Sequence, residues 1–141
     1  MKKSRKGFTL IEIMMVLAVI MILAGVAIPS MIRSRVTSNE ATTIVNLKGL
    51  YTAFIMYYND NDKEYPLALA EMSKYISASL AQGSKSGYLY VYQRIDEDTF
   101  EVNANPERLG NTGSRYFYLN ESGIIRYNSS GEASVTDPST E

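Results

Sequence analysis

The chain has 141 residues and a formal net charge of −1, which is enough for one membrane helix and one small globular head. It contains no histidine and no cysteine, so Ser-His and Cys-His nucleophile pairs are excluded and the usual zinc ligands are missing. There is no Gly-rich phosphate loop, and the acidic balance outside the N-terminus argues against nucleic-acid binding. We therefore expect no catalytic residue, no metal and no cofactor.

The chain begins with a short basic leader that continues into a long apolar run. The leader, residues 1–7, contains four basic side chains: Lys2, Lys3, Arg5 and Lys6. From Phe8 to Ile28 the one charged residue is Glu12. A helix of about 20 apolar residues spans the hydrocarbon of a bilayer, and the positive-inside rule holds a basic flank in the cytoplasm. The sequence therefore predicts a single-pass helix with a cytoplasmic N-terminus, and it places everything after Pro29 beyond the membrane.

Two compatible interpretations apply to Glu12. The segment Thr9-Leu10-Ile11-Glu12 fits a capping box, in which Thr9 and Glu12 satisfy backbone groups at the helix start. A carboxylate inside an apolar span costs roughly a few kcal/mol at mid-membrane and less near the interface, so such a residue usually has a partner.

A proline lies inside the predicted helix. Pro29 cannot donate a hydrogen bond to the carbonyl of residue 25, and its ring crowds that carbonyl. Residue 25 is a glycine, which best tolerates the resulting distortion. We predict a hinge from Gly25 to Pro29, either a kink or a melted turn, with a slightly bent continuous helix as the alternative.

Residues 30–59 continue the helix with an amphipathic pattern. An apolar stripe follows spacings of three and four through Ala41, Ile44, Leu47, Tyr51, Phe54 and Tyr58. The pattern places Glu40, Asn46 and Lys48 on the opposite side. We expect the stripe to pack a globular domain onto this half of the helix.

The rest of the chain, residues 60–141, predicts a small β head. Asp60–Glu64 indicates a solvated turn, since it lacks the glycine and the distant glutamate of a calcium loop. A short helix is expected over Leu67–Ile76, with Leu69, Met72 and Ile76 inward, and a loop over Gln82–Gly87. Four strands should follow at Tyr88–Gln93, Phe100–Pro106, Arg115–Leu119 and Ile124–Tyr127. The polar tail from residue 128 is predicted to be loose or draped across the head.

The hexapeptide Gly7-Phe8-Thr9-Leu10-Ile11-Glu12 resembles the processing signature of type IV prepilins and of type II secretion pseudopilins. This resemblance implies that a prepilin peptidase cuts after Gly7 on the cytoplasmic side and then methylates the new N-terminus at Phe8. It implies that Glu12 pairs with the terminal amine of a neighbouring subunit during assembly.

The same resemblance implies that the helix can unwind around Pro29 in the filament. The chain departs from the family pattern at Met21, where many members have a glycine, so a melted segment would be shorter here. It also lacks the cysteines with which many pilins close a C-terminal loop, so the head must be held by packing alone.

Together these observations predict an α+β fold, pilin-like, with a long N-terminal helix packed against a small antiparallel β-meander. The expected segments are a leader (1–7), a transmembrane and assembly half of the helix (8–29), an amphipathic half (30–59) and a head with a polar tail (60–141). Removing the leader leaves 10 Lys and Arg against 15 Asp and Glu, a charge of −5.

The expected function is that of a structural subunit, not an enzyme, that polymerises into a type IV pilus or a pilus-like filament. The expected partners are other copies of the chain, the prepilin peptidase, an inner-membrane assembly platform and membrane lipid before assembly, with no nucleic acid. The precursor would lie in the bacterial inner membrane and the product in an extracellular pilus or periplasmic pseudopilus. Two alternatives stay open: a pseudopilin of a type II secretion system, and a permanently anchored single-pass protein with a small periplasmic binding domain.

Overall fold

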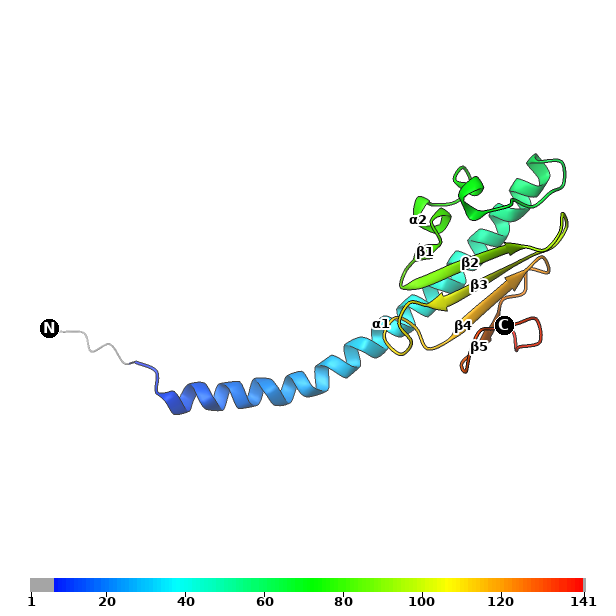
Figure 1. Ribbon diagram of the computed structural model, residues 1–141. Coiled ribbons are helices and arrows are strands. Elements are labelled where there is room, and N and C mark those ends of the chain that lie inside the picture. Colours follow the sequence, from blue (N-terminus) through cyan, green and yellow to red (C-terminus); the bar gives the residue numbers. More distant parts are fainter. Residues whose placement is uncertain (1–6, 141) are drawn as a thin grey trace. The chain divides into compact units, whose positions relative to one another are not determined.

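The computed structural model describes residues 7–140, which form helices and one sheet (Figure 1). The elements are α1 (Leu10–Asp60), η1 (Leu69–Met72), α2 (Ala78–Ala81), β1 (Ser84–Lys85), β2 (Tyr88–Arg94), β3 (Phe100–Pro106), β4 (Tyr116–Asn120) and β5 (Arg126–Asn128). The described residues divide between Ser34 and Arg35 into an N-terminal part and a head. The head therefore contains the second half of α1 together with all that follows.

The head contains one antiparallel sheet in the order β1-β2-β3-β4-β5, so consecutive strands are always neighbours. Within the head, α1 lies across one face of this sheet (Figure 1). The predicted α+β arrangement of a long helix and an antiparallel meander is confirmed. The meander has one strand more than expected, because the short strand β1 pairs with the start of β2.

The core lies between the head half of α1 and the inner face of the sheet. Residues at alternate positions of β3 point inward and are buried, as predicted for Phe100, Val102 and Ala104. The ring of Phe54 on α1 packs 4.3 Å from that of Phe100, centroid to centroid. The other buried residues of this core cluster are Leu47, Leu50, Ala53, Tyr65, Leu69, Met72, Leu80, Tyr88, Tyr90, Phe117, Leu119 and Ile125. Packing of helix against sheet therefore forms the core of the head, which has no disulfide.

The predicted helix Leu67–Ile76 is wrong in length, because η1 provides a single tight turn and α2 follows separately. The carboxylate of Glu71 accepts a hydrogen bond from the backbone N–H of Leu67 at 2.9 Å. The hydroxyl of Tyr75 donates to Asp60 of α1 at 2.8 Å. These side-chain bonds connect the two ends of the segment to its own first turn and to the end of α1.

Strand boundaries also differ from the sequence prediction, by one residue in β2 and β4 and by more around β1 and β5. The predicted loop Gln82–Gly87 contains β1, because Gly83 and Gly87 adopt positive φ angles of 78° and 75° and turn the chain back onto β2. The last strand begins at Arg126 and not at Ile124. The residues just before it are used by the turn after β4, in which the side chain of Asn120 accepts from Ser122.

The buried face of α1 is rotated relative to the predicted stripe. Glu40 and Asn46, predicted on the outer side, are 5 % and 8 % exposed, whereas Ala41, predicted inside, is exposed. The buried positions run from Glu40 through Thr43 to Asn46 and Leu47, again at spacings of three and four. The stripe is confirmed at Leu47 and Phe54, and Ile44, Tyr51 and Tyr58 pack against the core. The prediction was wrong at Glu40, Asn46 and Ala41 because it counted only apolar residues as candidates for the inner face.

A polar contact explains why Glu40 is buried. Its carboxylate accepts hydrogen bonds from the N–H and hydroxyl of Ser114, at 2.8 and 2.6 Å, and from Nε of Arg115 at 2.8 Å. The guanidinium of Arg115 also lies 5.4 Å from the ring centroid of Phe117. Burial raises the pKa of Glu40, but the hydrogen bonds from Ser114 and Arg115 outweigh it, so the pKa is below its usual value. This contact fastens the loop between β3 and β4 to α1.

Replacing Phe54 with alanine should lower the free energy of unfolding of the head by about 3–5 kcal/mol, because it removes a fully buried ring and leaves a cavity. Thermal unfolding of the full chain in detergent measures this loss. Met56→Ala, on the exposed side of the same helix, is the control and should change stability little. Equal effects of the two substitutions would contradict the assigned core.

Replacing Glu40 with glutamine should lower the free energy of unfolding by about 1.5–3 kcal/mol, since it removes a charged acceptor from Arg115. Because the pKa of Glu40 is lowered on folding, its contribution is present above the usual glutamate pKa and is lost as pH falls through the folded value. The difference in melting temperature between wild type and Glu40→Gln should therefore be constant near neutral pH and shrink below about pH 4. A difference that is absent at neutral pH would contradict the role of this contact.

Candidate processing and assembly segment

A capping box opens α1, as the sequence predicts. The carboxylate of Glu12 accepts hydrogen bonds from the backbone N–H of Thr9 at 2.7 Å and from the Thr9 hydroxyl at 2.6 Å. The backbone N–H of Glu12 donates in return to the Thr9 hydroxyl oxygen at 3.3 Å. In a single copy the carboxylate is therefore held at the helix start by its own chain.

The residues predicted for processing lie just before this helix. Gly7, Phe8 and Thr9 are not helical, and both Gly7 and Phe8 are exposed. No atom lies within 4 Å of the position that a Cβ on Gly7 would occupy. A Cβ at residue 7 would thus meet no described part of the chain beyond its two neighbours, so a requirement for glycine there would come from another molecule. The basic residues before Gly7 lie outside the described residues.

The N-terminal part of α1 exposes an unbroken set of large apolar side chains. The large aliphatic side chains between Leu10 and Ile28 are between 48 % and 81 % exposed, and Phe8 is 85 % exposed. In length and composition, α1 is the one helix among residues 7–140 that qualifies for crossing a membrane. Exposed apolar surface on this scale marks a site of contact with lipid or protein.

The predicted hinge residues lie within continuous helix. The helical conformation extends through Gly25 and Pro29, so this structure has the continuous helix given as the alternative and not a melted turn. Pro29 still offers no N–H to the carbonyl of Gly25, which leaves a weak point in the hydrogen bonding of the helix. Whether this point bends in an assembly is not tested by the single chain, and the hinge stays a prediction.

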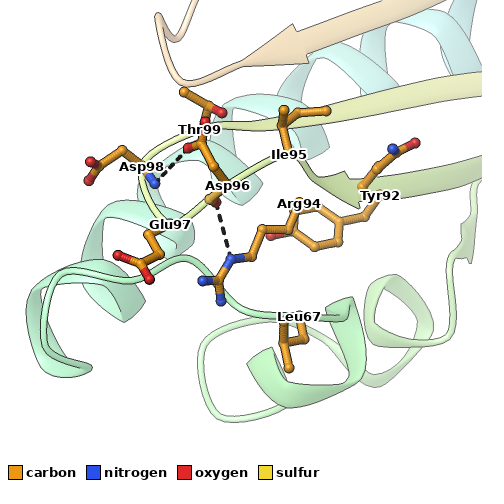
Figure 2. A pocket seen from close by; sticks show the side chains of 9 residues that line it. Leu67, Tyr92, Arg94, Ile95, Asp96, Glu97, Asp98 and Thr99 are labelled. Carbon is orange, nitrogen blue, oxygen red and sulfur yellow. Dashed lines mark hydrogen bonds between the residues drawn. The ribbon is translucent and has the colours of Figure 1, made fainter.

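The head also has a surface depression of about 850 Å³ at the turn between β2 and β3 (Figure 2). The guanidinium of Arg94 donates to the backbone carbonyls of Tyr65 at 2.9 Å and Asp96 at 3.1 Å. It also lies 3.4 Å from the carboxylate of Glu64. These bonds engage the guanidinium in holding the turn. Among residues 7–140 no group of three or more acidic side chains is placed to hold a metal ion.

Comparison with known proteins identifies the same N-terminal segment. Residues 2–28 match the family model described as the prokaryotic N-terminal methylation motif. The chain is 36 % identical over 83 residues to the type IV major pilin protein PilA of Myxococcus xanthus, covering 59 % of this chain and 36 % of that protein. It is 38 % identical over 60 residues to the type IV wide pilus major component PilA4 of Thermus thermophilus, covering 43 % and 46 %.

A second group of relatives belongs to a secretion system. The chain is 29 % identical over 86 residues to the type II secretion system core protein G of Klebsiella pneumoniae, covering 61 % of each protein. No solved structure matches the chain significantly. The chain spans between about a third and three fifths of the length of these curated relatives. The N-terminal part of the chain therefore carries the prokaryotic N-terminal methylation motif, and the resemblance to type IV prepilins and type II secretion pseudopilins is confirmed.

Proposed function

We propose that this chain is a structural subunit that polymerises into a type IV pilus or a pilus-like filament. The observation that supports this most strongly is the exposed apolar half of α1, directly following a matched N-terminal methylation motif. Relatives in the first group are named as pilus components, and none of the relatives described above has an enzyme's name. The proposed role is accordingly mechanical.

The physical basis of assembly is the transfer of apolar surface between two water-free environments. Burying apolar surface stabilises by ~25 cal/mol per Å² relative to water. A single copy leaves the side chains of Phe8 to Ile28 exposed, so in water they need lipid or other copies of the same helix. Contacts between copies that repeat head to tail without closing produce an open helical filament. The bilayer would hold the precursor and the filament core would hold the product.

The proposed maturation begins in the bacterial inner membrane, with the basic leader in the cytoplasm. A prepilin peptidase would cut between Gly7 and Phe8 and methylate the new amine of Phe8. Both residues are exposed and outside the helix, which suits access by an enzyme. An inner-membrane assembly platform would then lift the subunit out of the bilayer into an extracellular pilus or a periplasmic pseudopilus.

Glu12 would set the stagger between neighbouring subunits. A carboxylate in an apolar filament core is costly unless it is paired with an opposite charge. The amine of Phe8 on a neighbouring copy is the proposed partner, and it would replace or join the bonds from Thr9. A copy docked at the wrong height would leave both charges unpaired, so the pair would select one register.

Gly25 and Pro29 would let the helix adapt during this transfer. The helix lacks one backbone hydrogen bond at Pro29 and has no side chain at Gly25, so bending there costs less than elsewhere. The proposed hinge would act as the subunit leaves the flat membrane for a curved bundle.

A pseudopilin of a type II secretion system is the second candidate. The motif and the apolar helix fit it as well as they fit a pilin, and the core protein G relatives support it directly. Purifying surface filaments and identifying their main chain distinguishes the two. The permanently anchored protein is the third candidate, and it would keep its leader.

Replacing Gly7 with leucine should block leader removal and trap the precursor in the membrane. The substitution meets no neighbour in its own chain, so a defect would reflect recognition by the peptidase. The measurement is the ratio of precursor to mature chain in membrane fractions on a denaturing gel, with a host that lacks the peptidase as reference. Normal filaments from Gly7→Leu would count against the proposed processing.

Replacing Glu12 with valine should leave processing intact and reduce the yield of sheared filaments by about tenfold or more, the factor for losing ~1.4 kcal/mol per docked copy. Glu12→Gln separates charge from shape, since it can keep a hydrogen bond to Thr9 but cannot pair with an amine. Glu97→Gln, in an exposed turn of the head, is the matched control and should assemble normally. Wild-type filament yield from both Glu12 variants would show that Glu12 does not set the stagger between subunits.

A further inference from the structure

The C-terminal segment 129–140, here named the strap, pairs with the last strand of the sheet. The N–H of Tyr127 donates to the carbonyl of Pro138 at 3.0 Å, and the N–H of Thr140 donates to the carbonyl of Ile125 at 2.9 Å. Arg126 and Ser139 form an isolated antiparallel bridge. The strap therefore occupies the edge of β5 that β4 leaves open.

The strap also reaches the face of the sheet opposite α1. Its Glu132 accepts a hydrogen bond from the side chain of Asn105, on β3, at 2.8 Å. Ala133 is buried, although it lies in a tail without regular structure. Tyr118 is 8 % exposed, while its neighbours in β4 are the buried Phe117 and Leu119 of the core. Since side chains alternate along a strand, Tyr118 lies on the outer face that the strap crosses.

The carboxylate of Asp137 accepts three of the hydrogen bonds that hold the strap in place. Oδ2 of Asp137 accepts from the backbone N–H and the hydroxyl of Ser134, at 2.7 and 3.0 Å. Oδ1 accepts from the amide of Asn128 on β5 at 3.2 Å, and the Asp137 carbonyl accepts from Arg126 at 2.8 Å. Asp137 thus joins the turn within the strap to the strand that the strap covers.

We propose that residues 129–140 are a releasable strap that seals the last strand edge and part of the outer face of the sheet, and that Asp137 is the residue that holds it closed. An open strand edge presents unpaired backbone groups to any other extended chain. A closed strap pairs with the open edge of β5 and so prevents another extended chain from pairing there. This inference concerns the head alone and does not depend on the proposed filament function.

The charge on Asp137 gives closure a defined pH dependence. Hydrogen bonds from Ser134 and Asn128, together with the positive charge of Arg126, lower the pKa of Asp137. The other charged group in the described strap is Glu132, which contacts Asn105 and not Asp137. A lowered pKa means that the stabilisation is present above the usual aspartate range and is lost as pH falls through the folded value. Loss of the Asp137 charge in acid should therefore weaken the hydrogen bonds that hold the strap closed.

Amide hydrogen exchange of the full chain in detergent, read by mass spectrometry, tests this proposal. Asp137→Ala removes both accepting oxygens, and Val135→Ala, an exposed position in the same strap, is the matched control. In Asp137→Ala the exchange of peptides covering 125–128 and 134–140 should accelerate on the order of tenfold or more, with β2 and β3 unchanged. As pH falls, exchange of these peptides should accelerate in the wild type and in Val135→Ala by the same factor.

Three results would overturn the proposal. Equal exchange in Asp137→Ala and Val135→Ala would show that the carboxylate does not hold the strap. Acceleration of β2 and β3 by the same factor would make Asp137 part of the global fold and not of a local closure. A strap in Asp137→Ala that still opens further below pH 4 to the same extent as the wild type would assign the pH response to another group.

Discussion

The constraint on which the rest of this molecule depends is that a segment of about twenty mostly apolar residues is not covered by the rest of its own chain. The side chains from Phe8 to Ile28 are exposed in the single copy, and water is an unfavourable solvent for them. Each proposed step of maturation and assembly follows from the need to keep these side chains out of water. In the proposed function, the bilayer would provide a water-free environment for the precursor, and neighbouring copies of the same helix would provide it for the filament.

The head solves the corresponding problem for the second half of α1. There the helix presents a mixed face, with apolar side chains such as Leu50 and Phe54 beside the polar Glu40 and Asn46. The sheet covers the apolar part, and the loop after β3 supplies donors for the carboxylate of Glu40. One helix can therefore carry an assembly segment and a folded head, because each half meets a different kind of partner.

The sequence predicts those parts of the structure that depend on local patterns. The apolar run, the capping box at Thr9 and Glu12, and the alternation along β2 and β3 all follow from spacing and residue type. The burial of Glu40 does not, because it depends on Arg115, which lies 75 residues away in the chain. The draped tail, one of the two predicted alternatives, agrees with the structure, but its pairing of residues 138–140 with β5 is not predicted, since a polar tail carries no signal for its partner. For the processing and hinge residues, a single chain contains neither the peptidase nor a neighbouring subunit, so their roles stay predictions.

We propose that the apolar helix is an assembly element that acts after its basic leader is removed. The most direct test is the intact mass of the wild-type chain recovered from sheared filaments. The recovered chain should begin at Phe8 and carry one added methyl group. A chain found only as a membrane-bound monomer that keeps Met1 to Gly7 would contradict it.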